Sequence, residues 1–188
     1  MSASPSARVT PTSLRTVSVP SLGCAHATSR RDAAPMRVGH LPEGDGSAVL
    51  GEILSDLRAF WGERDMLALH HPVWLRQFAP DALVVREHDE LLGYLLGAVT
   101  AQGLAYVHLI AVREDSRRRG IGGLLYDAFI HAAQDRGAHR VEAITTTTNT
   151  ASIAFHRRLG FSADVVPDYA GPGAPRILFA RALPSEGR

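Results

Sequence analysis

The sequence predicts a single α/β domain, built on a central mixed sheet of about six to seven strands with about four helices on both of its faces. Three observations lead to this fold class. From Met36 onwards, strand-like segments alternate with segments of helical periodicity. The clearest helical segment, residues 121–133, lies between two strand-like segments, as expected for a sheet covered by helices. The 188 residues, 45% of them hydrophobic, suit one domain with one core.

Residues 1–35 differ from the rest and are expected to lie outside the domain, which we assign to residues 36–188. They are rich in Ser, Ala, Thr and Pro, with four arginines and one acid, and show no periodic apolar pattern. This composition predicts a disordered N-terminal extension. Two alternatives remain open: a start codon assigned too early, since Met36 begins the first ordered segment, and an organelle transit peptide.

The composition excludes several classes of protein. All 20 basic residues are arginine, so the Gly-Lys-Ser/Thr phosphate loop and any Schiff-base lysine are excluded. The single cysteine, Cys24, lies in residues 1–35, which argues against a disulfide, a cysteine-rich zinc site or a cysteine acyl-enzyme. Residues 1–35 carry a net charge of +3, which leaves −2 for residues 36–188. We therefore expect a cytoplasmic protein with neither a nucleic acid nor a membrane as its partner.

The first half of the domain reads as strand, two helical segments and a hairpin. In the first helical segment, Val49, Ile53 and Leu57 recur every fourth residue, whereas Pro72 interrupts the second segment. His88, Asp89 and Glu90 form a plausible tight turn between two strands. The expected elements are a strand at 36–39, helical segments at 47–60 and 66–78, and strands at 82–87, 91–99 and 104–112.

The second half contains two helices, each followed by a glycine. Apolar residues line one face of the helix that starts at Ile121, and Gly137 is expected to end it. Gly160 ends the second helix in the same way. The expected elements are helices at 121–136 and 150–159, with strands at 140–145, 163–166 and 176–182.

An anion site is predicted where the strand 104–112 runs through a basic turn into the helix that starts at Ile121. Glycines allow close approach of the backbone, unpaired N–H groups and the helix dipole favour negative charge, and arginines add charged donors. The alternative is a solvated basic turn. A dinucleotide fingerprint would need glycine where Leu125 stands, so that interpretation is weak. The turn reads Arg117-Arg118-Arg119-Gly120-Ile121-Gly122-Gly123.

This turn resembles motif A of the GNAT superfamily of N-acetyltransferases, Q/R-x-x-G-x-G/A, at every fixed position. The resemblance extends to the strand end Leu109-Ile110-Ala111-Val112 before the turn. It also extends to Asn149 and to the segment from Phe155 to Leu159-Gly160-Phe161 after it. The resemblance covers about residues 36–183. It is specific over residues 104–161, whereas before residue 104 only the order of the elements matches.

The resemblance implies acetyl-CoA, or another acyl-CoA, as the co-substrate, and no metal. Backbone N–H groups of residues 118–123 would bind the pyrophosphate, and the edge of the strand 104–112 would pair with the pantetheine arm. Asn149 would contact that arm, although the N-cap of the helix at 150 is an equally good and compatible role. The implied cofactor-binding residues are Ile110, Ala111, Val112, Arg117, Arg118, Arg119, Gly120, Ile121, Gly122, Gly123 and Asn149.

The acid and the base are where this sequence departs from the family pattern. The family's usual general acid is a tyrosine at the position of His156, which is either catalytic here or a histidine on the helix surface. A glutamate that serves as base in some members is replaced by Ile144, so Glu142 on the same strand face is a candidate. His108 is a further candidate, facing either an acceptor cleft or the core. A water relay without a dedicated base remains an alternative.

The acceptor site would, by the resemblance, be bounded by the first two helices and the last hairpin. The stretches 61–65, 70–74 and 168–169 fall there, with acids available to a cationic amine. Helix packing is the alternative explanation for their aromatic residues. The adjacent histidines at 70 and 71 do not share a helix face and so do not form a metal pair. The candidate acceptor-binding residues are Trp61, Trp74, Tyr106 and Tyr169.

The sequence therefore favours an acyl-CoA-dependent N-acetyltransferase. It is expected to transfer an acetyl group directly from acetyl-CoA to an amine of a small molecule or peptide. The alternatives are a non-catalytic acyl-CoA-binding regulator, and an O-acyltransferase or longer-chain acyltransferase. Family members often form dimers, so a homodimer is also an open expectation.

Overall fold

The structure, a computed structural model, describes residues 36–41 and 44–184, which form one seven-stranded mixed sheet. The strand order is β1-β2-β3-β4-β5-β7-β6, and every neighbouring pair is antiparallel except β4 and β5. The expected fold class is confirmed, whereas residues 1–35 lie outside the described residues. The strands are β1 (Arg37–His40), β2 (Leu83–Glu87), β3 (Glu90–Val99), β4 (Leu104–Val112), β5 (Arg140–Thr145), β6 (Ser162–Val166) and β7 (Arg176–Ala182).

The helices differ from expectation in the first half of the chain. The segment 47–60 is two helices, because Asp56 leaves the helical conformation with φ −123° and ψ 27°. Its carboxylate pairs with Arg113, 57 residues away, a contact that no local pattern reports. The segment 66–78 is interrupted at Pro72, as expected, and holds one short turn of helix on either side of it. The helices are α1 (Gly46–Ser55), α2 (Leu57–Trp61), α3 (Val73–Arg76), α4 (Ile121–Asp135) and α5 (Thr150–Arg158), with 3-10 turns η1 (Leu67–Leu69), η2 (Ala79–Asp81) and η3 (Glu114–Ser116).

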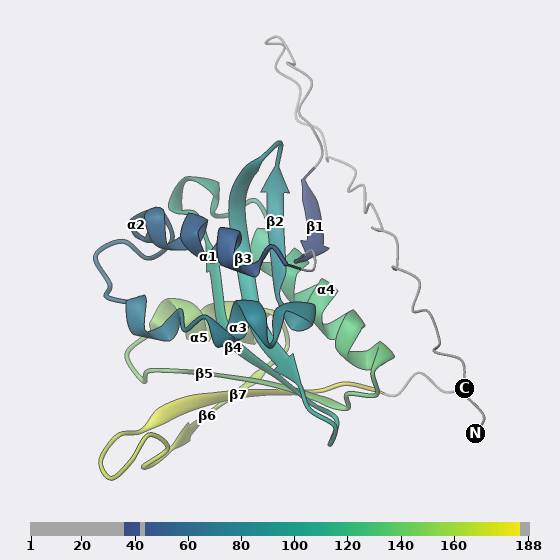
Figure 1. Cartoon of the computed structure of the whole chain (residues 1–188). Helices are drawn as coiled ribbons and strands as arrows, with labels where there is room; N and C mark the ends of the chain where they lie inside the picture. Colours follow the sequence, from purple (N-terminus) through teal and green to yellow (C-terminus); the bar gives the residue numbers. More distant parts are fainter. Residues whose placement is uncertain (1–35, 42–43, 185–188) are drawn as a thin grey trace, which may run out of the picture.

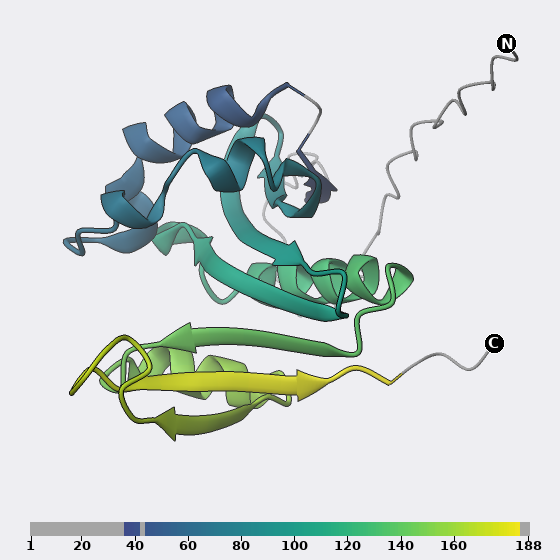
Figure 2. The same ribbon diagram turned by 60° about the horizontal axis from the view of Figure 1, so that its bottom comes forward.

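The helices cover both faces of the sheet, as Figures 1 and 2 show. Helices α1 to α3 lie on one face of β2 to β4, and α4 crosses the opposite face. Two apolar clusters result, one centred on Phe129 of α4 and one on Ile53 of α1. Helix α5 packs next to the second half of the sheet, in the cluster of α4. Among the described residues, no helix is long and apolar enough to cross a membrane.

Short-range signals predicted the turns well. The β2–β3 hairpin turns at His88 and Asp89, with His88 at φ 55°. Gly137 and Gly160 follow α4 and α5 at φ 84° and 81°, a backbone conformation in which glycine carries no steric penalty. The predicted hairpin and both predicted helix ends are therefore confirmed.

A β-bulge interrupts β4 at His108. Leu96 lies opposite Leu109 and Gly97 lies opposite Val107, so one step along β3 corresponds to two along β4. A bulge inserts an unpaired residue and shifts which side chains face each side of the sheet. Val107 consequently packs in the cluster of α4, whereas Leu109 packs in the cluster of α1 to α3.

Candidate active site

Strands β4 and β5 separate in the middle of β4. Their parallel pairing runs from Leu104 opposite Arg140 to Val107 opposite Ala143. Beyond this point no described strand pairs with that edge of β4, and Figure 2 shows the two strands diverging. Unpaired backbone groups on a strand edge can hydrogen-bond an extended ligand. The resemblance described above implies that three residues of this stretch bind the cofactor: Ile110, Ala111 and Val112.

Helix α4 begins next to this edge with an uncapped N-terminus. Gly120 occupies the N-cap at φ 82°, and no side chain caps the helix. Within the described structure, none of the backbone N–H groups of residues 118–123 donates a hydrogen bond to the protein. Arg118 also has a positive φ, of 64°. The unpaired N–H groups and the dipole of this 15-residue helix favour an anion at this place.

The three arginines of the turn differ in their partners. Arg119 forms a two-pronged ion pair with Glu87, with N···O distances of 2.5 and 3.2 Å. Arg117 donates to the Phe60 carbonyl at 3.1 Å and to Glu114 at 3.4 Å. Arg118 has no partner among the described residues. Two of the three charges are thus already compensated by carboxylates, so the backbone N–H groups and Arg118 are the donors left for a ligand.

The glycines of the turn have different surroundings. A Cβ atom on Gly122 would lie 3.0 Å from the Phe155 ring and 4.0 Å from Val112, so this glycine allows α5 to approach α4. A Cβ atom on Gly123 would meet nothing within 4 Å. A side chain at Gly123 would therefore project from the first turn of α4 without disturbing the packing.

His156 is buried at the contact between α5 and α4. Its Nδ1 lies 2.8 Å from the Ser152 carbonyl, which can only accept, so Nδ1 carries the proton. Its Nε2 lies 2.7 Å from the Tyr126 hydroxyl, and therefore accepts from that group. The ring stacks on Phe179 at 3.8 Å, and burial lowers the pKa of His156 to about 4. The side chain is 3% exposed, so it does not lie on the helix surface.

Asn149 caps α5. Its Oδ1 accepts from the Ser152 N–H at 3.2 Å, and its Nδ2 donates to the Thr145 hydroxyl at 2.9 Å. The residue thereby joins the end of β5 to the start of α5. Its capping role is seen directly, and contact with a pantetheine arm remains a prediction.

The bulge residue His108 faces the helices on the α1–α3 side. Its Nε2 donates to the Leu69 carbonyl at 2.9 Å, which leaves Nδ1 as the unprotonated nitrogen. The ring lies parallel to Trp74, with centroids 4.2 Å apart and an interplanar angle of 10°. Burial lowers the pKa of His108, so the ring is neutral at pH 7. His108 is thus a fixed neutral imidazole with a free lone pair at the point where β4 and β5 part.

A chain of three hydrogen bonds connects α2 with η1. The Trp61 indole donates to the Tyr94 hydroxyl at 2.7 Å, Tyr94 donates to His70 Nε2 at 2.7 Å, and His70 Nδ1 donates to the Met66 carbonyl at 2.8 Å. Burial lowers the pKa of His70, consistent with this neutral tautomer. These hydrogen bonds fix Trp61 next to η1, whose Leu69 carbonyl accepts a hydrogen bond from His108.

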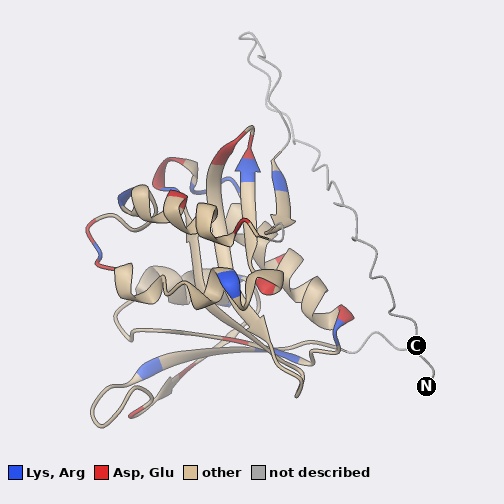
Figure 3. Cartoon of the chain, in the orientation of Figure 1, with Lys and Arg blue, Asp and Glu red and all other residues tan. Residues whose placement is uncertain are grey.

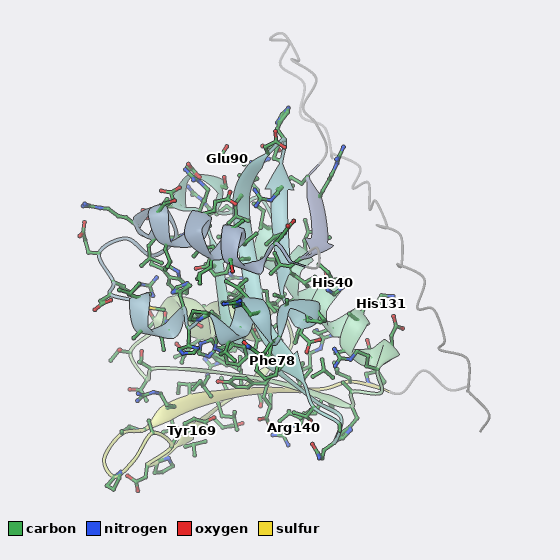
Figure 4. The ribbon with its side chains drawn as sticks, viewed as in Figure 1. His40, Phe78, Glu90, His131, Arg140 and Tyr169 are labelled. Atoms are coloured by element: carbon green, nitrogen blue, oxygen red, sulfur yellow. The ribbon has the colours of Figure 1, made fainter. Side chains whose placement is uncertain are left out.

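Tyr106, two residues before His108 on β4, and Glu142 of β5 lie where the two strands are still paired. They are direct neighbours in the β4–β5 register, and Glu142 forms an ion pair with Arg140 at 2.5 Å. Burial raises the pKa of Tyr106, with smaller contributions from Tyr169 and Glu142. Tyr169, on the loop between β6 and β7, is 44% exposed and lies at the tip of the molecule in Figure 4.

The structure therefore places the predicted residues in groups along β4. Tyr106 lies opposite Glu142 in the strand register and within electrostatic range of Tyr169, His108 stacks on Trp74, and the turn before α4 follows the end of the strand. His156 lies inside the α4–α5 contact, and the Tyr126 hydroxyl that it accepts from is within electrostatic range of Tyr106. Sequence reasoning missed Tyr94 and Tyr126, because their partners are 33 and 30 residues away and only the fold brings them together. The described residues contain no cluster of three or more side chains that could hold a metal ion.

The model of the Acetyltransferase (GNAT) family matches residues 48–161, which is more than half of the chain. This chain belongs to the GNAT acetyltransferase family. The resemblance inferred from the turn is thereby confirmed, and the protein is an acyltransferase enzyme.

Similar proteins agree with this membership. The L-methionine sulfoximine/L-methionine sulfone acetyltransferase of Pseudomonas paraeruginosa is 28% identical over 122 residues, covering 61% of this chain and 71% of the relative. An aminoglycoside 6'-N-acetyltransferase solved with coenzyme A has a TM-score of 0.62 at 18% identity, covering 80% and 99% of the two chains. The ribosomal-protein-S18-alanine N-acetyltransferase of Escherichia coli has a TM-score of 0.59 at 19% identity, covering 81% and 97%. These two structures share the GNAT fold of this chain.

Proposed function

We propose that this GNAT enzyme transfers an acetyl group directly from acetyl-CoA to an amine of a small molecule or peptide. The uncapped N-terminus of α4 next to the open edge of β4 carries this proposal. An anion site beside an unpaired strand edge suits a ligand with a pyrophosphate and an amide-containing arm. A solved neighbour with coenzyme A bound supports it.

The chemistry requires one proton acceptor. The amine nitrogen attacks the thioester carbonyl, the N–C bond forms, the C–S bond breaks, and the electron pair leaves with the sulfur. An acceptor that arrives as an ammonium group must lose one proton to a base before it attacks, and the second proton that it loses on amide formation balances the thiolate. We assign this role to His108, because Leu69 holds the proton on Nε2 and leaves Nδ1 free. Trp74 fixes the plane of the ring and acts as a positioning residue.

Glu142 and Tyr106 are proposed to receive the acceptor amine. The Glu142 carboxylate lies next to Tyr106, and because only its Oε1 pairs with Arg140, its Oε2 can accept from an ammonium group. Such a pair attracts an ammonium group before it loses its proton. Tyr169, on the loop between β6 and β7, and Trp61 of α2 are proposed to bound the acceptor site.

His156 is proposed to act through Tyr126, as a positioning residue. Both of its ring nitrogens are engaged inside the protein, and it fixes the Tyr126 hydroxyl at the α4–α5 contact. Because α4 presents the anion site, a displaced α4–α5 contact would shift the N–H groups that bind the pyrophosphate. Asn149 would support the pantetheine arm from the start of α5.

Relatives and neighbours support an amine acceptor. One relative acetylates L-methionine sulfoximine and L-methionine sulfone, and the neighbours act on an aminoglycoside and on the alanine of a ribosomal protein. A cytoplasmic location and a homodimer stay predictions, and light scattering of the full chain would measure the latter.

Two measurements on the full chain test the proposal. Titration calorimetry should detect coenzyme A binding, and a thiol reagent should detect free coenzyme A when acetyl-CoA is mixed with amines. Binding of coenzyme A without thiol release across amino acids, aminoglycosides, polyamines and short peptides would contradict the transfer. Absence of binding at millimolar coenzyme A would contradict the cofactor assignment as well.

A further inference from the structure

The segment between α2 and η1 carries three consecutive charged residues, Glu63, Arg64 and Asp65. The sequence suggested that its acids would receive a cationic amine. The structure gives both acids other partners: Glu63 pairs with Arg58, and Asp65 Oδ1 accepts from the Leu67 N–H at 3.2 Å. The residue without a carboxylate partner is therefore the arginine between them.

Arg64 lies against Trp61. Its guanidinium carbon is 5.2 Å from the centroid of the indole, and its Nε donates to the Trp61 carbonyl at 3.3 Å. Gly62, at φ 63° and ψ −133°, reverses the chain directly after Trp61 in a conformation that only glycine adopts at low cost. Cation–π contact and this turn fix the guanidinium, while its two terminal NH2 groups have no partner in the described part of the chain.

Three other guanidinium groups near β4 and β5 are compensated by carboxylates, whereas the unpartnered Arg118 belongs to the turn that is proposed to bind coenzyme A. Arg113 pairs with Asp56, Arg119 with Glu87 and Arg140 with Glu142. Arg64 therefore differs from them in keeping its positive charge and its terminal donors free. The described residues supply no hydrogen-bond acceptor for its terminal NH2 groups, which remain available to the substrate that receives the acetyl group.

The position of the segment fits a role in binding the acceptor. In Figures 1 and 2, the α2–η1 segment and the β6–β7 loop lie on the same side of the molecule, on either side of the gap between β4 and β5. Figure 3 shows charges of both signs gathered on this segment. Leu67 and Leu69, which follow it in η1, are 60% and 43% exposed. An unpaired guanidinium thus stands next to exposed apolar side chains.

We propose that Arg64 binds a carboxylate of the acceptor, and that the acceptor is an amine carrying both a carboxylate and an apolar group, as an apolar α-amino acid does. The inference rests on the proposed function, because it names the acceptor class of the same site. The planar guanidinium presents paired N–H donors that match the two oxygens of a carboxylate. The cation–π contact with Trp61 leaves those terminal donors available.

Binding measurements test this without relying on turnover. The full chain is saturated with coenzyme A and titrated with L-leucine, L-methionine and L-methionine sulfone, and with the amide of each. The wild type should bind the acids more tightly than the amides. Arg64→Gln should weaken binding of the acids about 10-fold or more and leave the amides unchanged, because one charge-assisted contact is lost. Arg76→Gln, at an exposed arginine on α3, is the matched control and should leave every affinity unchanged.

Equal affinity for acids and amides, no binding of either, or unchanged affinity in Arg64→Gln would overturn the inference. Its failure differs from failure of the proposed function. Binding that depends on Arg64, without thiol release from acetyl-CoA, would contradict acetyl transfer alone. Thiol release that Arg64→Gln does not alter would support acetyl transfer and overturn the carboxylate contact.

Discussion

The Tyr126 hydroxyl donates to His156 Nε2 across 2.7 Å, and this contact joins α4 to α5 inside an apolar core. The imidazole must stay neutral to accept that bond. Its other nitrogen, Nδ1, already donates to the Ser152 carbonyl. The rings of Phe155, Phe161 and Phe179 surround this polar pair. Both hydrogen bonds of the His156 ring can therefore form only when the ring is neutral and carries its proton on Nδ1.

The first prediction concerns stability against pH. The pKa of His156 falls from about 6.5 in the unfolded chain to about 4 in the folded chain, so below pH 6.5 the unfolded state binds more protons. We therefore expect the protonation of His156 to have no effect on the free energy of unfolding above pH 6.5. As the pH falls from 6.5 to 4, it should lower the free energy of unfolding by up to about 3 kcal/mol. Urea unfolding at pH 7 and pH 4.5 measures the loss.

The control replaces both partners. In Tyr126→Phe/His156→Phe the buried pair becomes apolar, so the variant should lose less stability between pH 7 and pH 4.5 than the wild type does. His156→Phe alone leaves the Tyr126 hydroxyl buried without an acceptor, and should be the least stable of the three at pH 7, by about 1–3 kcal/mol. An identical pH dependence in wild type and double variant would contradict the role of His156.

The second prediction concerns the anion site. Gly123→Glu places a negative charge in the first turn of α4, where there is room for it. The substitution should raise the free energy of unfolding by about 1 kcal/mol, because glycine is a poor helix former and an acid suits a helix N-terminus. The same charge should weaken coenzyme A binding at least 10-fold by calorimetry. Gly123→Ala should gain stability while keeping its affinity, so a normal affinity in Gly123→Glu would refute the site.

The third prediction concerns Glu87. Its two-pronged pair with Arg119 compensates a charge directly before the N-cap of α4. Glu87→Gln should free that guanidinium and tighten coenzyme A binding by up to about 5-fold, the range of an exposed ion pair. The gain should shrink at 1 M salt, where exposed charges are screened. Weaker binding in Glu87→Gln would instead mean that Glu87 orients Arg119 toward the phosphates.

The fourth prediction concerns His108. His108→Gln should lower kcat about 100-fold or more while leaving the Kd of coenzyme A unchanged, because only the proton acceptor is lost. Since burial lowers the pKa of His108, the acid limb of the wild-type pH–rate profile should lie below pH 6.5. That limb should vanish in the variant. If His108→Gln keeps the kcat and the pH–rate profile of the wild type, His108 is not the base and a water relay must accept the proton.

The fifth prediction concerns Tyr94. Tyr94→Phe removes the hydroxyl between Trp61 and His70 and leaves two buried polar groups without a partner. We expect a loss of about 1–3 kcal/mol in the free energy of unfolding and a raised KM for the acceptor. The affinity for coenzyme A should change less than the acceptor KM, because the turn before α4 reaches this part of the protein only through the bond from Arg117 to the Phe60 carbonyl. A changed coenzyme A affinity with an unchanged acceptor KM would contradict this assignment.

Local patterns predicted the regular parts of the fold. The apolar stripe of α4, its glycine end and the turn at His88 depend on residues within a few positions of one another, so periodicity and turn chemistry report them. The break at Asp56 was missed, and the carboxylate of this residue pairs with Arg113 far along the chain, a contact that local periodicity does not report. The interruption of residues 66–78 at Pro72 was predicted, whereas the bonds from β3 and β4 to His70 and Leu69 depend on the fold.

For the site, the sequence by itself determined the turn from Arg117 to Gly123 and the family, because a strand, glycines and a helix start form a contiguous motif. Only the tertiary structure decided the state of each side chain. It buried His156 in a hydrogen bond with Tyr126 and left the Nδ1 atom of His108, at the β-bulge, without a proton. It also left Arg64 without a carboxylate partner, whereas its two acidic neighbours have partners. These outcomes depend on partners brought together by folding, and hydrogen bonding and burial then set protonation and charge.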